Sequence, residues 1–413
     1  MTIPDRLSMP HGKHKPLLAD TLAALLPTPG QTLLLRACLL SGAAGRQAGE
    51  AWLQQKPELG DILKEDRLKG LFPLLFSAFQ RNGVEVDTAF LTILRTASLR
   101  EELRARIYRR ICWEVLSTFA TAGIPIMILK GAVLADTVYA NPALRHSHDI
   151  DILLAEPDPS QAVRLLSSLR FVPLRQAGDL EWQDLQFVHE SGLPLVLHRH
   201  PFRLPLYNAT TAELWTRSHR QIIADIPASI LSPPDQLLHV CGHAASCSSR
   251  ESLRWVCDAW LLIKRYPNLE WDILLDGALR NHLALPLSIT LSYLVKELQV
   301  PIPAACLQRL HTAASQASTL EREIALWGVR AGTRGRFKTL LQLSDDWRSR
   351  VFVLKWIFLP SPAYLYAVQQ CRPSWRLPFY YFARPLWYVV RSIRRQYQTR
   401  WPRRAKSGNL STV

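Results

Sequence analysis

The chain has 413 residues, 48% of them hydrophobic and 20% charged, which excludes a disordered chain and predicts two or three domains with a substantial core. The net charge of +16 is concentrated late in the chain, because 13 Lys and Arg but no acidic residue follow Asp346. The rest of the chain is close to neutral, so the charge does not make the remainder a nucleic-acid binder.

The first hundred residues are dominated by helical patterns. Apolar residues recur at helical spacing from Leu33 to Leu40 and from Leu71 to Phe79. A long amphipathic helix is predicted from Glu101 to Ala122, and Gly123 is a good C-terminal stop.

The pattern changes after Gly123, where short apolar runs alternate with helical segments. This alternation, followed by a hairpin, predicts a small mixed α/β domain. The predicted strands are Ile124–Leu129, Asp149–Leu154, Phe171–Leu174, Asp184–His189 and Pro194–His198, and the predicted helices are Gly131–Tyr139 and Ser160–Leu169.

Helical patterns return after Pro233. The predicted helices there are Asp235–His243, Ser252–Tyr266, Trp271–Arg280, Leu285–Leu298 and Pro303–Ala314. The expected fold class is therefore α+β, with a small mixed-sheet core flanked by mainly helical N- and C-terminal regions. We expect a helical region over residues 1–100, the core over 101–230, a helical domain over 231–346 and a basic aromatic tail over 347–413.

Cysteine usage and the apolar runs bear on the compartment. The seven cysteines are scattered and form no CxxC pair, which fits reduced thiols in a cytoplasm. The segment from Met1 to Lys15 lacks an apolar signal core, and no apolar run reaches the ~20 residues that span a bilayer. We expect a cytoplasmic protein, with peripheral contact at the inner membrane as a further expectation.

Two alternating aspartates give the strongest chemical signal. Asp149 and Asp151 lie two apart at the start of a predicted strand, which places both carboxylates on one face. Gly131 follows the preceding strand and opens a helix, where backbone N–H groups can approach a phosphate. Two carboxylates opposite such a turn can hold a divalent metal against a triphosphate.

The residues that carry this signal resemble a known family. Leu129-Lys130-Gly131-Ala132, followed by Arg145-x-Ser147-x-Asp149-Ile150-Asp151, is similar to the uncharacterised nucleotidyltransferase family of the polymerase-beta-like superfamily. Leu197-His198-Arg199, Leu238-His239 and Leu253-Arg254-Trp255 with Asp258 are also similar to that family. The resemblance covers roughly residues 50–280.

The resemblance implies a Mg²⁺-dependent enzyme that moves a nucleoside monophosphate from a nucleoside triphosphate to an unknown acceptor. It suggests a role beside polysaccharide or peptide natural-product biosynthesis. Asp149 and Asp151 would ligate the metal in a two-metal site. Lys130, Gly131, Arg145 and Ser147 would bind the nucleotide.

The third carboxylate of the family pattern is replaced here by Val196. His198, His200 or Glu190 could take its role, and His198 is the candidate catalytic residue among them. An alternative is a catalytically weak or inactive nucleotide-binding scaffold that docks at the inner membrane surface.

Several other polar residues and the tail have plainer interpretations. His239 and His243, four apart on a helix, are expected to pack in the core, and Asp258 is expected to anchor that helix. Fourteen aromatic residues lie among the arginines between residues 351 and 404. Packing with contact to an anionic membrane surface is the first interpretation of this tail, and nucleic-acid binding is the less favoured one.

Overall fold

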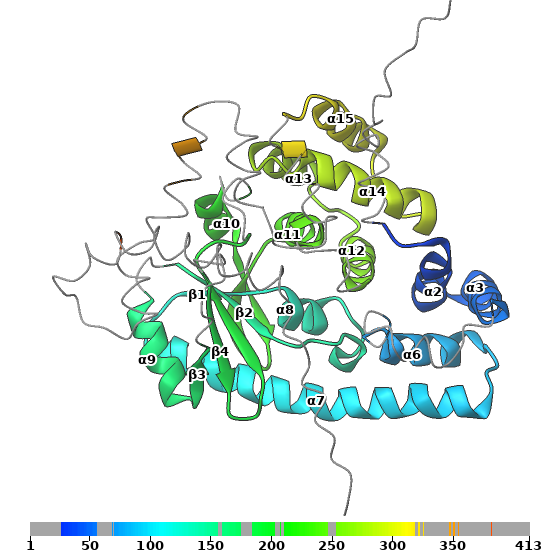
Figure 1. The fold of residues 1–413 in the computed structure, drawn as a ribbon, viewed down its shortest axis with the longest axis horizontal. Coiled ribbons are helices and arrows are strands. Elements are labelled where there is room, and N and C mark those ends of the chain that lie inside the picture. The colour runs from blue at the N-terminus through cyan, green and yellow to red at the C-terminus, as the bar shows by residue number, and fades with distance from the viewer. Residues whose placement is uncertain are drawn as a thin grey trace, which may run out of the picture.

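The computed structural model describes residues 26–55, 70–155, 159–174, 184–202, 210–246 and 253–318, with a few single residues outside these ranges. A mixed β-sheet lies at one end of the molecule and a group of helices at the other, and the long helix α7 (Thr88–Thr121) runs along both (Figure 1). The predicted tail over residues 347–413 lies outside the described residues apart from single positions.

The sheet has seven strands among the described residues, in the order β3-β4-β5-β2-β1-β7-β6. β1 pairs with β2 in antiparallel register and with β7 in parallel register, and β2 pairs with β5 in parallel register. The strands are β1 (Ile126–Leu129), β2 (Ile150–Leu154), β3 (Phe171–Pro173), β4 (Leu185–His189), β5 (Pro194–His198), β6 (His219–Ile223) and β7 (Ile226–Ile230).

The two faces of the sheet carry different chemistry. On one face Ile150 and Ile152 pack in a core with Phe119 and other residues of α7 and with α9 (Ser160–Ser168). The alternate residues of β2 are Asp151 and Leu153, and Leu153 packs on the opposite face against α10 (Thr211–Arg217). The strand period of two thus separates the apolar core from the face that carries the carboxylate.

The N- and C-terminal helices share one hydrophobic core, in which Leu35 and Leu75 pack in the same cluster as Leu262 and Leu291. The predicted boundaries at residues 100 and 230 stay predictions. The helices are α2 (Pro29–Leu39), α3 (Gly42–Gln54), α6 (Phe72–Asn82), α11 (Pro233–Ser246), α12 (Arg254–Arg265), α13 (Trp271–Arg280), α14 (Ala284–Leu298) and α15 (Ala304–Ser315).

The predicted α+β fold is confirmed, and two local expectations are corrected. Helix α7 begins at Thr88, earlier than the expected Glu101, because Asp87 accepts a hydrogen bond from the backbone of Phe90 and caps it. The β6–β7 hairpin was not predicted. Its first strand is mostly exposed and shows no apolar alternation, and its turn includes Ala224, a residue not typical of positive φ.

Candidate active site

Asp151 lies at the centre of the candidate site. Its side chain is only 3% exposed, and it pairs with Leu129 of β1 on one side and Val196 of β5 on the other. Asp149 lies just before β2, which begins at Ile150 rather than at the predicted Asp149. Its side chain is 27% exposed, so of the two carboxylates Asp149 is the more open to solvent.

Lys130 forms the turn from β1 into α8 (Lys130–Thr137) and reaches Asp151. Its backbone φ is 48°, a left-handed conformation that is uncommon for a residue with a side chain. Its Nζ lies 3.2 Å from Asp151 Oδ1. The turn therefore places an ammonium group directly beside the buried carboxylate.

His198 is held between two carboxylates. Its Nε2 lies 2.6 Å from Asp151 Oδ1 and its Nδ1 lies 2.9 Å from Asp184 Oδ1. Burial would lower the pKa of His198, but Asp184 and the hydrogen bonds to both carboxylates raise it to about 9. Because both ring nitrogens face carboxylates, the imidazolium form satisfies both contacts and leaves no lone pair for a metal or for base catalysis.

The two aspartates differ in their protonation behaviour. Burial, followed by the nearby charge of Asp151, raises the pKa of Asp149 above its ordinary value. Burial acts in the same direction on Asp151, but Lys130 and His198 outweigh it and hold the pKa of Asp151 well below its ordinary value. The pair thus combines a firmly ionised carboxylate with a more easily protonated one.

Arg145 forms a hydrogen-bonded network with Ser147, Asp258 and Tyr139, which we call the frame of the site. Its Nε and Nη2 each donate to a carboxylate oxygen of Asp258 at 2.8 Å, and its Nη1 donates to Ser147 Oγ at 3.0 Å. Tyr139 also donates its hydroxyl to Asp258, at 2.8 Å. Asp258 therefore anchors the loop before β2, and the expectation that it anchors the histidine helix is wrong.

Gly131 allows this frame to approach α8. A Cβ at this position would lie 3.0 Å from both Arg145 Nη1 and Ser147 Oγ. The glycine is thus favoured by close packing on the arginine loop, whereas the left-handed turn conformation falls on Lys130.

The loop before β2 is fixed along its backbone by side chains of α7 and α12. These donors satisfy carbonyl groups that the short loop cannot pair with itself. The contacts are Arg104 Nε to Ser147 O at 3.1 Å, Tyr108 Oη to Asp149 O at 2.5 Å and Arg254 Nη1 to His146 O at 2.5 Å.

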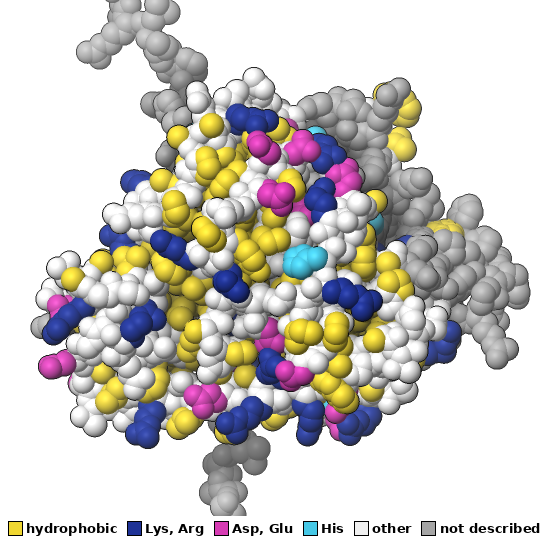
Figure 2. Space-filling model, turned by 180° about the vertical axis from the view of Figure 1, so that it is seen from behind, with side chains coloured by type: hydrophobic (Ala, Val, Ile, Leu, Met, Phe, Trp, Pro, Cys, Tyr) yellow, Lys and Arg dark blue, Asp and Glu magenta, His cyan; other side chains and the backbone are white. Residues whose placement is uncertain are grey.

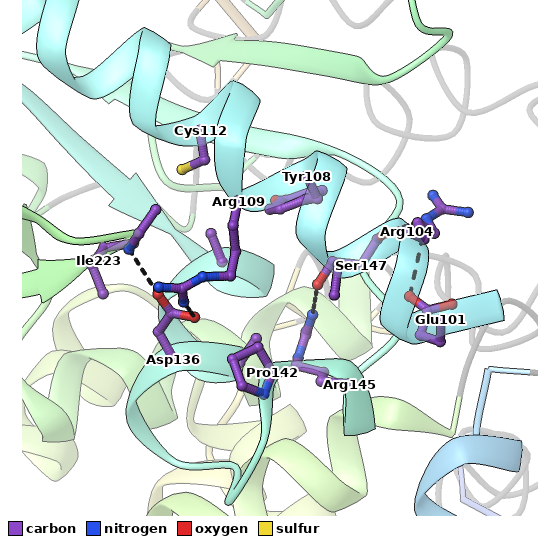
Figure 3. A pocket seen from close by; sticks show the side chains of 14 residues that line it. Glu101, Arg104, Tyr108, Arg109, Cys112, Asp136, Pro142, Arg145, Ser147 and Ile223 are labelled. Carbon is purple, nitrogen blue, oxygen red and sulfur yellow. Dashed lines mark hydrogen bonds and ion pairs between the residues drawn. The ribbon is translucent and has the colours of Figure 1, made fainter. Parts of the chain in front are cut away.

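Two clefts lie near this frame, on different sides. The larger, of about 380 Å³, lies between α7 and α8, and Arg109, Asp136, Arg145 and Ser147 line it (Figure 3). Asp151 is not among its lining residues. The smaller, of about 230 Å³, lies beside the site and is lined by Lys130, Gln236 and His239 among apolar side chains. We consider the smaller cleft to be the relevant one because it contains Lys130, which contacts Asp151.

Comparison with known proteins identifies the family of the chain. Residues 56–298, more than half of the chain, match the uncharacterised nucleotidyltransferase family. The chain belongs to this family. No curated protein and no solved structure is similar enough to the chain to match it.

Membership in the nucleotidyltransferase family implies a nucleoside triphosphate as substrate and, as is typical of such enzymes, a divalent metal. Within the described part of the chain, no group of three or more His, Cys, Asp or Glu side chains is arranged to hold a metal ion. Mg²⁺ usually takes only one or two protein carboxylates and completes its shell with phosphate oxygens and water. Asp149 and Asp151 therefore suit one such ion held together with a nucleotide.

The structure brings together most of the predicted site residues of this chain. Asp151, Lys130 and His198 are in direct contact, and Asp149 lies beside them. Arg145 and Ser147 contact each other and Gly131, and a phosphate contact by Arg145 would require the Asp258 pair to open.

Sequence reasoning missed Asp184. This residue immediately precedes β4, and the antiparallel pairing of Leu185 with Leu197 places it beside His198. The predicted hairpin of β4 and β5 contained the necessary signal, because its register determines which residue faces His198. Neither the spacing from Asp151 nor any motif indicated this contact.

His239 and the helices agree with the plainer interpretations. His239 is buried and its Nε2 donates to Pro201 O at 2.9 Å. Burial, with a contribution from Lys130, lowers the pKa of His239 to about 3, so the ring is neutral. None of the described helices combines the length and hydropathy that a bilayer-spanning segment requires.

Proposed function

We propose that this chain transfers a nucleoside monophosphate from a nucleoside triphosphate to an acceptor and releases pyrophosphate. The observation that carries the proposal is the contact of Lys130 with Asp151 beside Asp149, at the β1–α8 turn of a nucleotidyltransferase-family chain. Phosphoryl and nucleotidyl transfer depend mainly on positioning and on charge stabilisation, which this small group of residues can supply.

Asp149 and Asp151 are the residues that would hold Mg²⁺. Asp151 Oδ1 is bonded to Lys130 and His198, which leaves Oδ2 of Asp151 and the more exposed carboxylate of Asp149 as donors. When bound, the ion would supply charge neutralisation at the reacting phosphate. Hard carboxylate oxygens are the donors that Mg²⁺ prefers, so the donor chemistry fits.

Lys130 is the residue that we assign to the triphosphate. Its side chain is 17% exposed, and it borders the 230 Å³ cleft between β1, α8 and α11. An ammonium at this position can exchange part of its contact with Asp151 for a phosphate oxygen without leaving the site. Gln236 lies at the same cleft, and its Oε1, which has no hydrogen-bond partner among the described residues, is available to contact a further part of the nucleotide.

Arg145, Ser147 and Gly131 are proposed to position the site. The buried pair of Arg145 with Asp258 fixes the loop that leads into β2, and Ser147 lies against Gly131 on α8. The geometry of both aspartates therefore depends on this loop. His198, held by Asp184, is proposed to orient Asp151 rather than to take a proton.

The test compares wild type with Asp149→Asn, Asp151→Asn and a control, Asp272→Asn, whose side chain on α13 is 95% exposed. Nucleotide binding is measured by calorimetry with and without Mg²⁺, and pyrophosphate release is measured with candidate acceptors. We expect Mg²⁺-dependent binding in wild type and the control, and a loss of turnover of roughly 100-fold or more in each site variant. Nucleotide binding by wild type that is equally strong with and without Mg²⁺ would argue against the assignment of Asp149 and Asp151 as metal ligands.

A second candidate function is nucleotide binding without turnover. Val196 stands beside Asp151 where the family pattern has a third acid, and His198 is already engaged by two carboxylates. This candidate predicts Mg²⁺-dependent nucleotide binding that is lost in Asp149→Asn, with no pyrophosphate release for any acceptor. Pyrophosphate release by wild type that is lost in the same variant would exclude it.

A further inference from the structure

Helix α7 exposes a row of large hydrophobic side chains along its outer face. Five such residues of this one helix are between 41% and 62% exposed, whereas its buried apolar residues pack on the helical core in the first half and on the sheet in the second half. We call this surface the α7 stripe, and its hydrophobic members are Leu91, Leu99, Leu103, Ile107 and Trp113. They extend over 23 residues of helix, from Leu91 to Trp113, a length of about 33 Å.

The charged residues of α7 that are exposed rather than half-buried are all basic. Helix α7 is described along its whole length, and its exposed charged residues are Arg95, Arg100, Arg106 and Arg110. Its three acidic residues are turned inward or partly covered. Of these, Glu101 bonds to His146, Glu102 is half-buried, and Glu114 lies 3.9 Å from Arg110.

The position of α7 leaves this face open. The helix runs along one edge of the molecule, with the sheet and the other helices on its inner side (Figure 1). Seen from behind, the lower edge of the molecule carries several Lys and Arg side chains, with hydrophobic ones and a few Asp and Glu between them (Figure 2). The stripe is therefore an elongated surface that combines apolar contacts with positive charge.

We propose that the α7 stripe docks the protein on an anionic lipid surface. Leucine and isoleucine side chains insert into the boundary between headgroups and acyl chains, a tryptophan lies among the headgroups, and arginines contact lipid phosphates. A helix lying in the plane of the interface needs this combination of one apolar stripe and basic flanks.

Charge decides between this partner and a second copy of the chain. Two stripes packed together would bring eight exposed arginines into one interface without an exposed acidic residue from either helix. An anionic bilayer instead complements these four exposed arginines of α7 and covers the apolar side chains at the same time.

Docking through α7 has a consequence for the site. The inner face of α7 packs on the face of the sheet that carries Ile150 and Ile152, whereas Asp151 lies on the opposite face. The bilayer would therefore lie across the sheet from Asp151. This inference does not depend on the proposed nucleotidyl transfer, because it uses different residues.

The test uses the full chain in sedimentation with phosphatidylcholine vesicles, with and without phosphatidylserine. We expect binding only to the anionic vesicles. Arg106→Gln with Arg110→Gln should weaken it by roughly 25-fold, about fivefold for each arginine. Leu103→Glu with Ile107→Glu should weaken it by roughly tenfold or more.

The matched control is Val172→Glu with Ile222→Glu, which places the same charges on exposed apolar positions of the two edge strands, 62% and 55% exposed. This control should bind the anionic vesicles as wild type does. Circular dichroism checks that each variant folds. If the Leu103→Glu with Ile107→Glu variant does not fold, the vesicle binding of the arginine variant still tests the proposal.

Three results would overturn the proposal. The first is equal binding of wild type to both kinds of vesicle, or no binding to either. The second is unchanged binding in both α7 variants, which would assign any membrane contact to another part of the chain such as residues 347–413. The third is a dimer in light scattering that the Leu103→Glu with Ile107→Glu variant dissociates, which would make a second copy the occupant.

Discussion

Asp258→Leu tests whether the buried pair with Arg145 holds the site loop in place. The side chains of Arg145 and Asp258 are 9% and 5% exposed, and two hydrogen bonds of 2.8 Å join them. Burial opposes the charge of Arg145, but Asp258 outweighs it and raises the pKa of the guanidinium. Removing the carboxylate leaves this charge buried without its partner, which destabilises a protein by about 3–5 kcal/mol.

A double-mutant cycle separates the pair from its surroundings. Arg145→Met alone should also destabilise the protein, because Asp258 then keeps only the hydroxyl of Tyr139 among the donors that contact it. Arg145→Met with Asp258→Leu removes both charges and fills the space with apolar side chains. We expect the double variant to lie within about 2 kcal/mol of wild type, with a coupling energy of at least about 2 kcal/mol.

Urea unfolding followed by circular dichroism measures these free energies. The control is Asp276→Asn, because Arg280 and Asp276 are also 2.8 Å apart but are 43% and 62% exposed. This exposed pair should change the free energy of unfolding by about 0.5 kcal/mol or less. The reasoning is refuted if Asp258→Leu costs less than about 1 kcal/mol, or if the double variant equals the sum of the single ones.

Three further predictions concern the turn and the site. Gly131→Ala should destabilise the protein by about 1–3 kcal/mol in urea unfolding, since its Cβ would lie 3.0 Å from Arg145 and Ser147, and adding Ser147→Gly should recover part of this loss. Lys130→Gly should be more stable than Lys130→Met by about 1 kcal/mol, because both variants remove the ammonium group but only glycine adopts the positive φ without strain. Equal stability of the two variants would show that the backbone of Lys130 is not strained. The pKa of His198 is raised to about 9 in the folded protein, so the unfolded chain loses this proton at a lower pH than the folded chain does. In metal-free protein, the stability that His198 contributes is therefore complete below about pH 6.5 and is lost as the pH rises to about 9. His198→Gln should abolish this decline in the free energy of unfolding, and a decline that persists would contradict the assignment.

Local sequence signals predicted the elements that carry them. The helix over Trp271–Arg280 was predicted with the bounds that the structure has, and Gly123, with a φ of 68°, ends α7 as expected. The strand pair Leu185–His189 and Pro194–His198 was predicted within a residue, because alternating apolar residues and a glycine turn are read from neighbouring positions. The hairpin β6–β7 lacked such a pattern and was missed.

The candidate site likewise contains features that the sequence predicted and contacts that only the structure shows. The Asp149–Asp151 spacing, the Lys130-Gly131 turn and the resemblance they carry were visible in the sequence, since each depends on a few neighbouring residues. The structure decided the contacts between distant segments: Arg145 with Asp258, and His198 with Asp184.

The sequence by itself therefore determined the family, the fold class and the paired aspartates. The tertiary structure alone decided that Arg145 is bound within the frame, that Asp184 holds His198, and that the outer face of α7 combines exposed apolar and basic side chains. The physical reason is that pairing and exposure depend on which segments pack together. A residue pattern determines the periodicity of an element, whereas the register of the sheet and the packing of the helices determine what each face meets.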